Sequence, residues 1–281
     1  MRTTSVDVQL PDQLVDRLVS RYGTDDPAEA VRNACYEARI EAAPRDQSTE
    51  VNQNAVFVYH DVGGDRGDGY GRSFPPTRFQ LELETFQAAG YEIVDVPTVL
   101  ETADGPGTQI ALTFDDALDS FYRQVKPLLE RYELPATLYV PTDVIGKEGH
   151  LTEDELVELA DHNLVTIGNH TQSHPLLPEV ADEATLRTEI IGAQQKLEEL
   201  LGITIDQFCY PCYKFDDRSI DIVSESHDLA VAGPPGHPII GGDELGPETD
   251  PYRIPRLDGV TYSELSLGMG IDRFGMPILN G

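Results

Sequence analysis

Short apolar runs alternate with helical patterns along most of the chain. The runs are short enough for buried strands, and they cover residues 55–59, 110–114, 136–140 and 164–167. Between them, apolar residues recur every three or four positions, which is the spacing of one face of a helix. These helical patterns lie near 77–89, 118–132, 152–161 and 181–201. Strands that alternate with helices predict an α/β domain with a parallel sheet, either open or closed into a barrel.

The N-terminal residues carry a different pattern. Residues 5–10 alternate polar and apolar side chains, as in a strand that buries one face. Two helical segments follow, one from Asp12 to Gly23 and one from about Pro27 to Ile40. A strand followed by two short helices resembles the ribbon-helix-helix family, whose members pair the strand across a dimer and read DNA with it.

The charge of this segment favours dimerisation over DNA binding. Residues 1–43 hold five Arg against eight Asp and Glu, whereas affinity for DNA comes largely from basic contacts to phosphate. A strand this short cannot bury its apolar face alone, so pairing with a second chain is the natural solution. We therefore predict a ribbon-helix-helix-like segment that forms a homodimer at 1–43, a polar linker at 44–54 and a catalytic domain at 55–281.

The composition is strongly acidic. Asp and Glu number 50 against 20 Lys and Arg, which gives a formal net charge of −30. The acids are spread along the whole chain, and such a field repels itself in dilute buffer and is screened at high ionic strength. This favours a halophilic protein from a high-salt cytoplasm. No run reaches the roughly 20 apolar residues that cross a bilayer, and the first residues lack a signal-peptide pattern, so we expect a cytoplasmic protein without a membrane partner.

Polar residues gather where the predicted strands of the large domain end. They are His60 and Asp61 after the first strand, Asp115 and Asp116 after the second, and His170 and His174 after the fourth. In parallel α/β folds the carboxyl ends of the strands converge on the ligand. Two imidazoles and a carboxylate make a mixed nitrogen and oxygen site for a divalent metal such as zinc.

Simpler explanations exist for these residues. The two histidines could be surface or capping residues, and one aspartate of the adjacent pair could cap a helix. Capping explains both aspartates less well. Neighbouring carboxylates repel each other, and a cation or an acid/base role would offset that repulsion.

Two segments carry a resemblance to the polysaccharide deacetylases, whose domain is also called the NodB homology domain. Residues 112–116 (LTFDD) look like the first motif of that family, and residues 167–174 (IGNHTQSH) look like the second. The resemblance implies an α/β fold, a distorted (β/α) barrel of the NodB type. Carried over by position, it makes Asp115 the catalytic base and assigns a divalent metal, zinc, to a set of three ligands. Those ligands would be Asp116, His170 and His174.

The later motifs depart from the family pattern. Residues 208–213 (FCYPCY) look like the third motif, in which the backbone N–H of Cys212 would donate to the oxyanion. The arginine that many members carry in this motif stands as Cys209 here. Arg256 is a candidate for the missing positive charge, although a surface arginine is an equally good reading of it.

The resemblance implies a carbohydrate N-deacetylase, a hydrolase of non-peptide C–N bonds that acts on an N-acetylated sugar or polysaccharide precursor. The chain has no Trp, so the tryptophan motif of the family is absent, and the histidine that usually serves as general acid is missing as well. His60 and His237 are the available substitutes. Three alternatives stay open: a hydrolase of cyclic amides in the same superfamily, a DNA-binding regulator that senses a sugar, and a pseudoenzyme.

Overall fold

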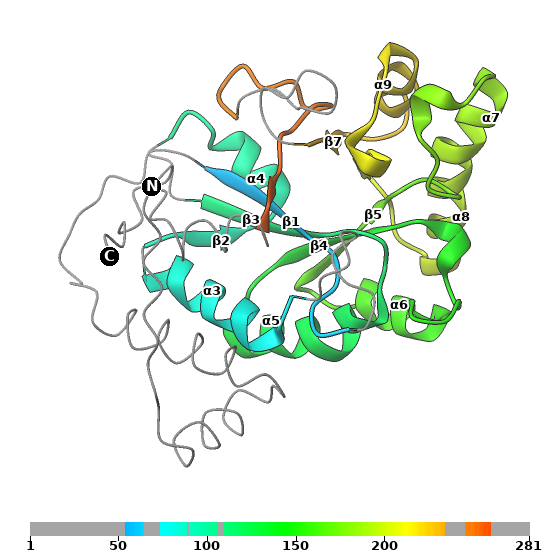
Figure 1. Cartoon of the computed structure of the whole chain (residues 1–281). Helices are drawn as coiled ribbons and strands as arrows, with labels where there is room; N and C mark the ends of the chain where they lie inside the picture. The colour runs from blue at the N-terminus through cyan, green and yellow to red at the C-terminus, as the bar shows by residue number, and fades with distance from the viewer. Residues whose placement is uncertain (1–53, 65–73, 89, 106–108, 234–244, 260–281) are drawn as a thin grey trace, which may run out of the picture.

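The computed structural model describes most of the chain from residue 54 onward (Figure 1). The described residues are 54–64, 74–88, 90–105, 109–233 and 245–259. The ribbon-helix-helix-like segment, nearly all of the linker and His237 lie outside the described residues. The homodimer through the N-terminal strand and the expected lack of DNA binding therefore stay predictions.

One parallel sheet forms the centre of the described domain. Its strands are β1 (Ala55–Tyr59), β2 (Glu92–Val94), β3 (Gln109–Phe114), β4 (Ala136–Val140), β5 (Val165–Asn169), β6 (Gln207–Cys209), β7 (Leu229–Val231) and β8 (Leu257–Asp258). They follow the order β7-β6-β5-β4-β3-β1-β8, and β2 pairs with β3 beside this path. The four predicted strands are confirmed as β1, β3, β4 and β5. The short strands β2, β6, β7 and β8 were not predicted.

The sheet curls into a partial barrel, as the resemblance to the polysaccharide deacetylases implies. After β7, the chain returns so that Ile254 bridges Val231 in parallel, and its next residues pair with β1 as strand β8. The segment from Ile254 to Asp258 thus spans the gap between the two edge strands, and it crosses the centre of the domain in Figure 1. This crossing segment contains Arg256, which is how a residue far along the sequence reaches the barrel interior.

Helices and helical turns cover the sheet. The α-helices are α3 (Pro76–Ala88), α4 (Val96–Glu101), α5 (Lys126–Tyr132), α6 (Glu153–Ala160), α7 (Glu183–Arg187), α8 (Ala193–Leu201) and α9 (Asp217–Ser224). The π turns are η1 (Phe121–Val125) and η4 (Thr188–Gly192), and the 3₁₀ turns are η2 (Thr142–Val144), η3 (Leu177–Glu179) and η5 (Pro211–Tyr213). The predicted helices near 118–132 and 181–201 are therefore present, but each contains a π turn.

Alternating strand residues divide the apolar core into an outer and an inner part. On β3, Ile110, Leu112 and Phe114 pack outward against the layer of α3, α5, α6 and α8. Ala111 of the same strand points inward, where it joins Tyr139 and Cys209. The same alternation directs Thr113 and Asp115 to the inner side, at the carboxyl end of the strand. Polar groups placed there meet at the mouth of the barrel.

None of the helices in the described part of the chain is long and apolar enough to cross a bilayer.

Candidate active site

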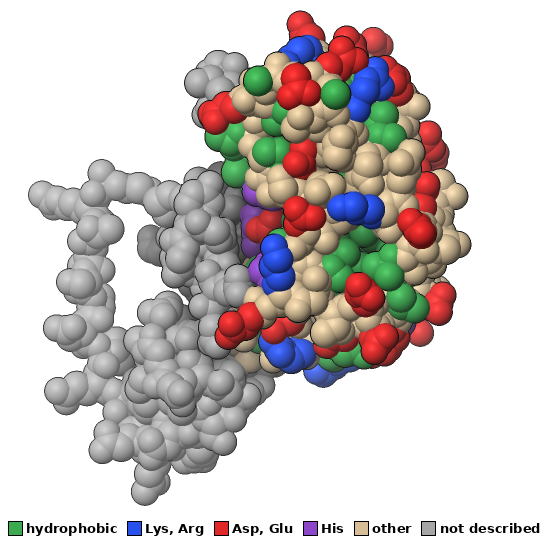
Figure 2. Space-filling view, turned by 90° about the vertical axis from the view of Figure 1, so that its right-hand side faces the viewer, with side chains coloured by type: hydrophobic (Ala, Val, Ile, Leu, Met, Phe, Trp, Pro, Cys, Tyr) green, Lys and Arg blue, Asp and Glu red, His purple; other side chains and the backbone are tan. Residues whose placement is uncertain are grey.

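The carboxyl ends of the strands bring the predicted site residues together. His60 follows β1, the pair Asp115 and Asp116 follows β3, and the two other histidines follow β5. This convergence is the expected result of a parallel sheet, in which all strands end at the same edge. In Figure 2 histidine side chains reach the surface beside acidic ones at the border of the described residues.

Asp116, His170 and His174 form a group with the composition of a metal site. Their potential donor atoms all lie within 4.8 Å of one another. Oδ1 of Asp116 lies 3.7 Å from Nε2 of His170 and 3.5 Å from Nε2 of His174. Ligands of a tetrahedral zinc ion at about 2.0–2.2 Å stand roughly 3.4 Å from each other, so Oδ1 of Asp116 lies close to that spacing from each imidazole. The residues present therefore fit a divalent metal.

His170 is held in the state that a metal ligand needs. Its Nδ1 lies 2.8 Å from the backbone carbonyl of Cys209, a contact that leaves Nε2 facing Asp116. Burial lowers the pKa of His170 to about 4, against the opposing effect of Asp115, so the ring is neutral at pH 7 with a free lone pair. A backbone carbonyl that fixes the far nitrogen is a common support of histidine ligands.

Left-handed backbone conformations occur at and between these potential ligands. The φ angles are 73° at Asp116 and 60° at His174, and Thr171 between the histidines has 69°. Residues other than glycine avoid this region, at a cost of about 1–3 kcal/mol each. Such strain persists only where the surrounding structure imposes it, and it is typical of functional sites.

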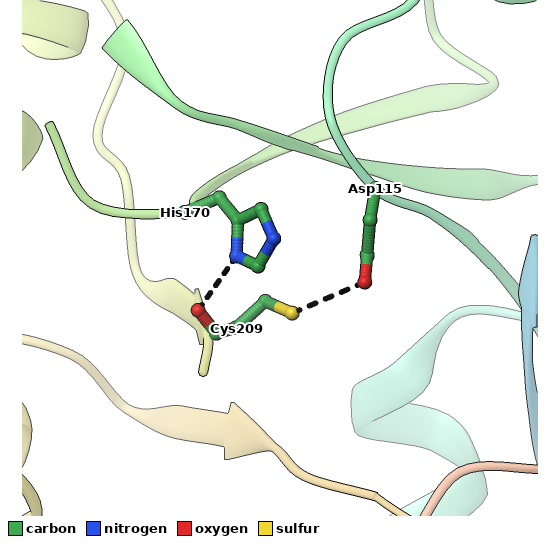
Figure 3. A group of neighbouring side chains, drawn as sticks. All are labelled: Asp115, His170 and Cys209. Atoms are coloured by element: carbon green, nitrogen blue, oxygen red, sulfur yellow. Dashed lines mark hydrogen bonds between the residues drawn. The ribbon is translucent and has the colours of Figure 1, made fainter. Parts of the chain in front are cut away.

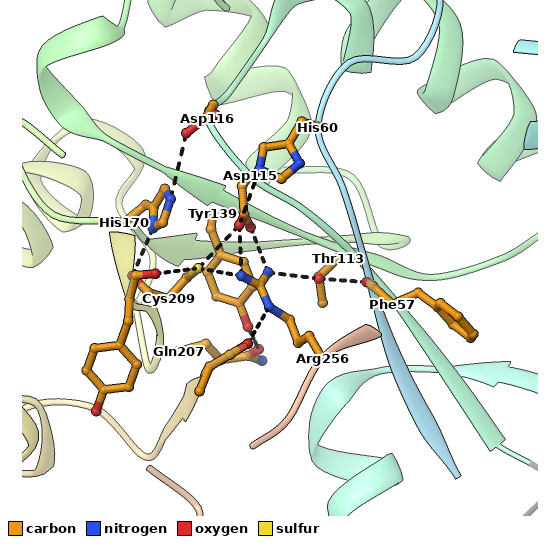
Figure 4. A network of polar contacts seen from close by, with 12 residues as sticks. Phe57, His60, Thr113, Asp115, Asp116, Tyr139, His170, Gln207, Cys209 and Arg256 are labelled. Carbon is orange, nitrogen blue, oxygen red and sulfur yellow. Dashed lines mark hydrogen bonds and ion pairs between the residues drawn. The ribbon is translucent and has the colours of Figure 1, made fainter. Parts of the chain in front are cut away.

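Asp115 is paired with Arg256 inside the barrel (Figure 4). The guanidinium donates from Nη1 to Oδ1 and from Nη2 to Oδ2, both at 2.8 Å, and both residues are buried. Burial alone would raise the pKa of Asp115. The charge of Arg256 and its hydrogen bonds outweigh burial and hold this pKa well below its ordinary value. Asp115 is therefore ionised at neutral pH.

The remaining donors of Arg256 are also satisfied. Nε donates to the carbonyl of Ala232 at 3.2 Å, Nη1 donates to the Thr113 hydroxyl at 3.1 Å, and Nη2 donates to Sγ of Cys209 at 3.0 Å. The guanidinium also faces the rings of Tyr139 and Tyr213. All five N–H groups thus have an acceptor, which is the condition for burying an arginine. The structure places this charge beside Cys209, the position at which the resemblance expects an arginine.

A second group of donor types lies beside the first. Atoms of Asp115, His170 and Cys209 also lie within 4.8 Å of one another (Figure 3). Arg256 already donates hydrogen bonds to the Asp115 carboxylate and to the Cys209 sulfur. Burial also raises the pKa of the Cys209 thiol well above its ordinary value. A neutral thiol next to a guanidinium is a poor ligand for a cation. The group of Asp116, His170 and His174 therefore has the composition better suited to a metal ion.

The other predicted residues lie around this centre. His60 is mostly buried, and its Nε2 stands 4.0 Å from Oδ2 of Asp115. Cys212 lies in the turn η5 with a left-handed φ of 51° and an exposed side chain. Partial desolvation of the thiol by the surrounding protein, with the nearby Asp116, raises the pKa of Cys212.

Sequence reasoning missed two polar residues of this region. Thr113, whose hydroxyl accepts from Arg256 and donates to the Phe57 carbonyl at 2.7 Å, lies within the LTFDD motif and could have been found as an inward strand residue. Glu189 is a buried acid at helical spacing from Leu186 on the apolar face of its helix. A charge on that face is the signal that could have identified it.

Comparison with known proteins identifies relatives of this domain. Residues 102–229 match the family model described as polysaccharide deacetylase. That range includes the three potential metal ligands, Asp115 and Cys212, whereas His60 and Arg256 lie outside it.

Relatives and a solved structure agree with this match. The protein YxkH from Bacillus subtilis is 21% identical over 186 residues, which cover 64% of this chain and 64% of that one. A peptidoglycan-N-acetylglucosamine deacetylase from Bacillus cereus is 32% identical over 106 residues, which cover 37% of this chain and 36% of the relative. The structure of IcaB from Ammonifex degensii superposes with a TM-score of 0.65 at 20% identity, covering 77% of this chain and 96% of that chain, and shows the same fold. The chain spans less than two thirds of the length of both curated relatives.

Proposed function

This chain contains a polysaccharide deacetylase domain, and from that premise we propose that the protein is a metal-dependent hydrolase that removes acetyl groups from N-acetylglucosamine-type sugars. The observation that carries the proposal is the convergence of Asp116, His170 and His174 beside a buried, ionised Asp115. The name of the Bacillus cereus relative supports the sugar, since it specifies N-acetylglucosamine in peptidoglycan.

Asp116, His170 and His174 would hold the metal, and the mixed nitrogen and oxygen donors favour zinc. When bound, a divalent ion at this position would polarise the acetamide carbonyl as a Lewis acid. His170 is already neutral at pH 7, so it can bind a cation without first losing a proton.

Asp115 is proposed as the proton acceptor. In hydrolysis, a water oxygen bonds to the acetyl carbon, the C–N bond breaks, and the products are acetate and a free amine. Oδ2 of Asp115, the oxygen nearest His60, accepts the proton that the attacking water loses. The Arg256 pair reduces the proton affinity of this carboxylate. In return it keeps Asp115 ionised at neutral pH and correctly oriented.

His60 and Cys212 complete the proposed machinery. His60 donates a proton to the departing nitrogen, because its imidazole lies on the side of Asp115 that carries Oδ2. The backbone N–H of Cys212 donates to the oxyanion that forms on the acetyl oxygen. This role depends on the backbone, so it tolerates a cysteine at that position.

The proposal extends to the environment in which the enzyme works. Acidic side chains are spread over the face shown in Figure 2, with Lys and Arg scattered among them. Together with the net charge of −30, this distribution favours function at high salt, in a cytoplasm rich in KCl. Assembly as a homodimer through residues 1–43 belongs to the same proposal, and its test is the size of the chain in solution with and without that segment.

Acetate release from N-acetylglucosamine oligomers tests the function. Protein stripped with a chelator should be inactive and should recover on addition of zinc. Asp115→Asn should lower kcat/KM by about 100-fold or more at unchanged zinc content, because it removes the acceptor of the proton. His60→Ala should lower kcat more than it changes KM.

Controls separate loss of chemistry from loss of folding. Asp119→Asn, four residues along from Asp115 and ion-paired with Arg123 on the surface, should keep activity within about 3-fold. Circular dichroism should show that each variant is folded. Zinc-dependent opening of a cyclic amide, without acetate release from the sugars, would instead favour the second hydrolase hypothesis.

A further inference from the structure

We propose that the π turn η4 is a clamp that holds the metal-binding loop in shape, with Glu189 as its positioning residue. The loop runs from Asn169 to His174 and carries two of the three potential ligands. The inference rests on the proposed function, because the placement of His170 and His174 matters through the metal they would bind.

Glu189 accepts three hydrogen bonds from the middle of the loop. The N–H groups of Gln172 and Ser173 donate to Oε2 at 3.1 and 2.8 Å, and the Ser173 hydroxyl donates to Oε1 at 2.7 Å. Glu189 is only 9% exposed, and a carboxylate so buried is stable only with partners of this kind. Two consecutive N–H groups on one oxygen fix the direction of the chain between the two histidines.

Asn169 ties the start of the loop to the same turn. Its Nδ2 donates to the carbonyl of Ile190 at 2.8 Å and lies 3.1 Å from Nε2 of His227, while its Oδ1 accepts the N–H of Thr171 at 2.9 Å. The Ile190 carbonyl and the Glu189 side chain are neighbours in the π turn. They therefore hold both the first residue and the centre of the loop.

The loop needs such support because its backbone is strained. Thr171 and His174 both have positive φ, and the N–H of His174 is held by the Thr171 hydroxyl at 3.0 Å. A loop in these conformations relaxes unless hydrogen bonds from outside oppose it. π turns are rare, are found mostly inside α-helices, and are frequent at functional sites. A helix at 183–201 that contains one where it meets the metal-binding loop fits this pattern.

Two measurements on the full chain test the clamp. Amide hydrogen exchange of the metal-free protein reports the order of residues 170–174, and competition with a chelator gives the zinc affinity. Glu189→Ala should speed exchange at Gln172 and Ser173 by at least about 10-fold and weaken zinc binding by about 10- to 100-fold. Glu189→Gln keeps an acceptor oxygen, so its loop exchange and its zinc affinity should both lie close to those of the wild type.

Gln194→Ala is the matched control. Gln194 is 8% exposed on the adjoining helix α8, and its side chain donates to the carbonyls of Ile205 and Ser226 rather than to the loop. This variant should lower the melting temperature, as Glu189→Ala does, yet change loop exchange and zinc affinity by less than about 3-fold.

The outcomes distinguish the clamp from the function beneath it. Loop exchange in Glu189→Ala equal to that of the wild type, or zinc affinity equal despite faster exchange, would overturn the clamp. Equal losses in Gln194→Ala would overturn it too, since the effect would then be general destabilisation. If the wild type binds no zinc but Glu189→Ala still exchanges faster in the loop than the wild type does, the proposed function is contradicted. The clamp is then still supported by its effect on the loop.

Discussion

Replacing Arg256 by Met should destabilise the domain strongly, because the change leaves a buried carboxylate without its partner. Asp115 is 3% exposed and Arg256 is 1% exposed, so water cannot replace the two 2.8 Å hydrogen bonds. Breaking one side of a buried pair costs about 3–5 kcal/mol. We expect the free energy of unfolding at pH 7 to fall by that amount. Urea unfolding at fixed KCl, followed by circular dichroism, measures it.

The pH dependence of this loss gives a sharper test. In the wild type the folded pKa of Asp115 is lowered, so the carboxylate contributes stability above its unfolded pKa of about 3.8, and this contribution is lost as pH falls through the folded pKa. Without Arg256, burial dominates and raises the folded pKa. The variant then loses stability as pH rises above about 3.8, so its deficit against the wild type should shrink as pH falls from 7 toward 4.

A double-mutant cycle and a surface control complete the experiment. Adding Asp115→Asn to Arg256→Met should restore part of the lost stability, with a coupling of at least about 2 kcal/mol. Arg187 donates to Glu225 at 2.6 and 2.9 Å in the same paired geometry but on the surface, so Arg187→Met should cost at most about 1 kcal/mol. The reasoning would be refuted if Arg256→Met and Arg187→Met lowered the free energy of unfolding equally. It would also be refuted if the effects of Asp115→Asn and Arg256→Met on that free energy were additive.

Three further predictions follow from buried groups. Burial lowers the pKa of His227 to about 4, so the unfolded state binds its proton first and this residue should lower stability by about 3 kcal/mol between about pH 6.5 and pH 4. His170 titrates in the same range, so His227→Gln should reduce the slope of stability against pH without removing it, and an unchanged slope would contradict the prediction. A methyl group at Gly168 would overlap the Tyr139 ring, so Gly168→Ala should cost about 1–3 kcal/mol in urea unfolding, whereas a neutral effect would show that the ring has room to move. Cys209 is fully buried and Cys212 is exposed, so a thiol reagent should label Cys212 at least about 10-fold faster than Cys209, as measured by peptide mass mapping. Equal labelling rates would mean that the barrel opens readily.

The sheet could be predicted where strands are long and continuously apolar. The runs at β1, β3, β4 and β5 gave correct strands, because a parallel strand buried on both faces has no polar alternation to obscure it. Strands β6 and β7 are three residues long, and such segments have no distinct period. The π turns were not predicted either, because a single wide turn hardly changes the spacing of apolar residues in a helix.

Some residues of the candidate site could be predicted from the sequence, and some of its contacts could not. Asp116, His170 and His174 follow predicted strands, so their meeting could be expected from topology alone. The contact between Arg256 and Asp115 joins residues 141 positions apart, and it depends on the path of the chain after β7. The support of Glu189 for the loop depends on the rotation of one helix. Contacts of this kind are set by tertiary packing, which no local pattern encodes.

The most direct test of the central claim is the zinc content of the purified chain, measured by mass spectrometry after metal removal and zinc add-back at high salt. We predict one equivalent of zinc in the wild type and in Asp119→Asn, and none in Asp116→Asn or His174→Ala. A wild type that stays metal-free, or variants that keep their zinc, would contradict the assignment of the metal to these residues.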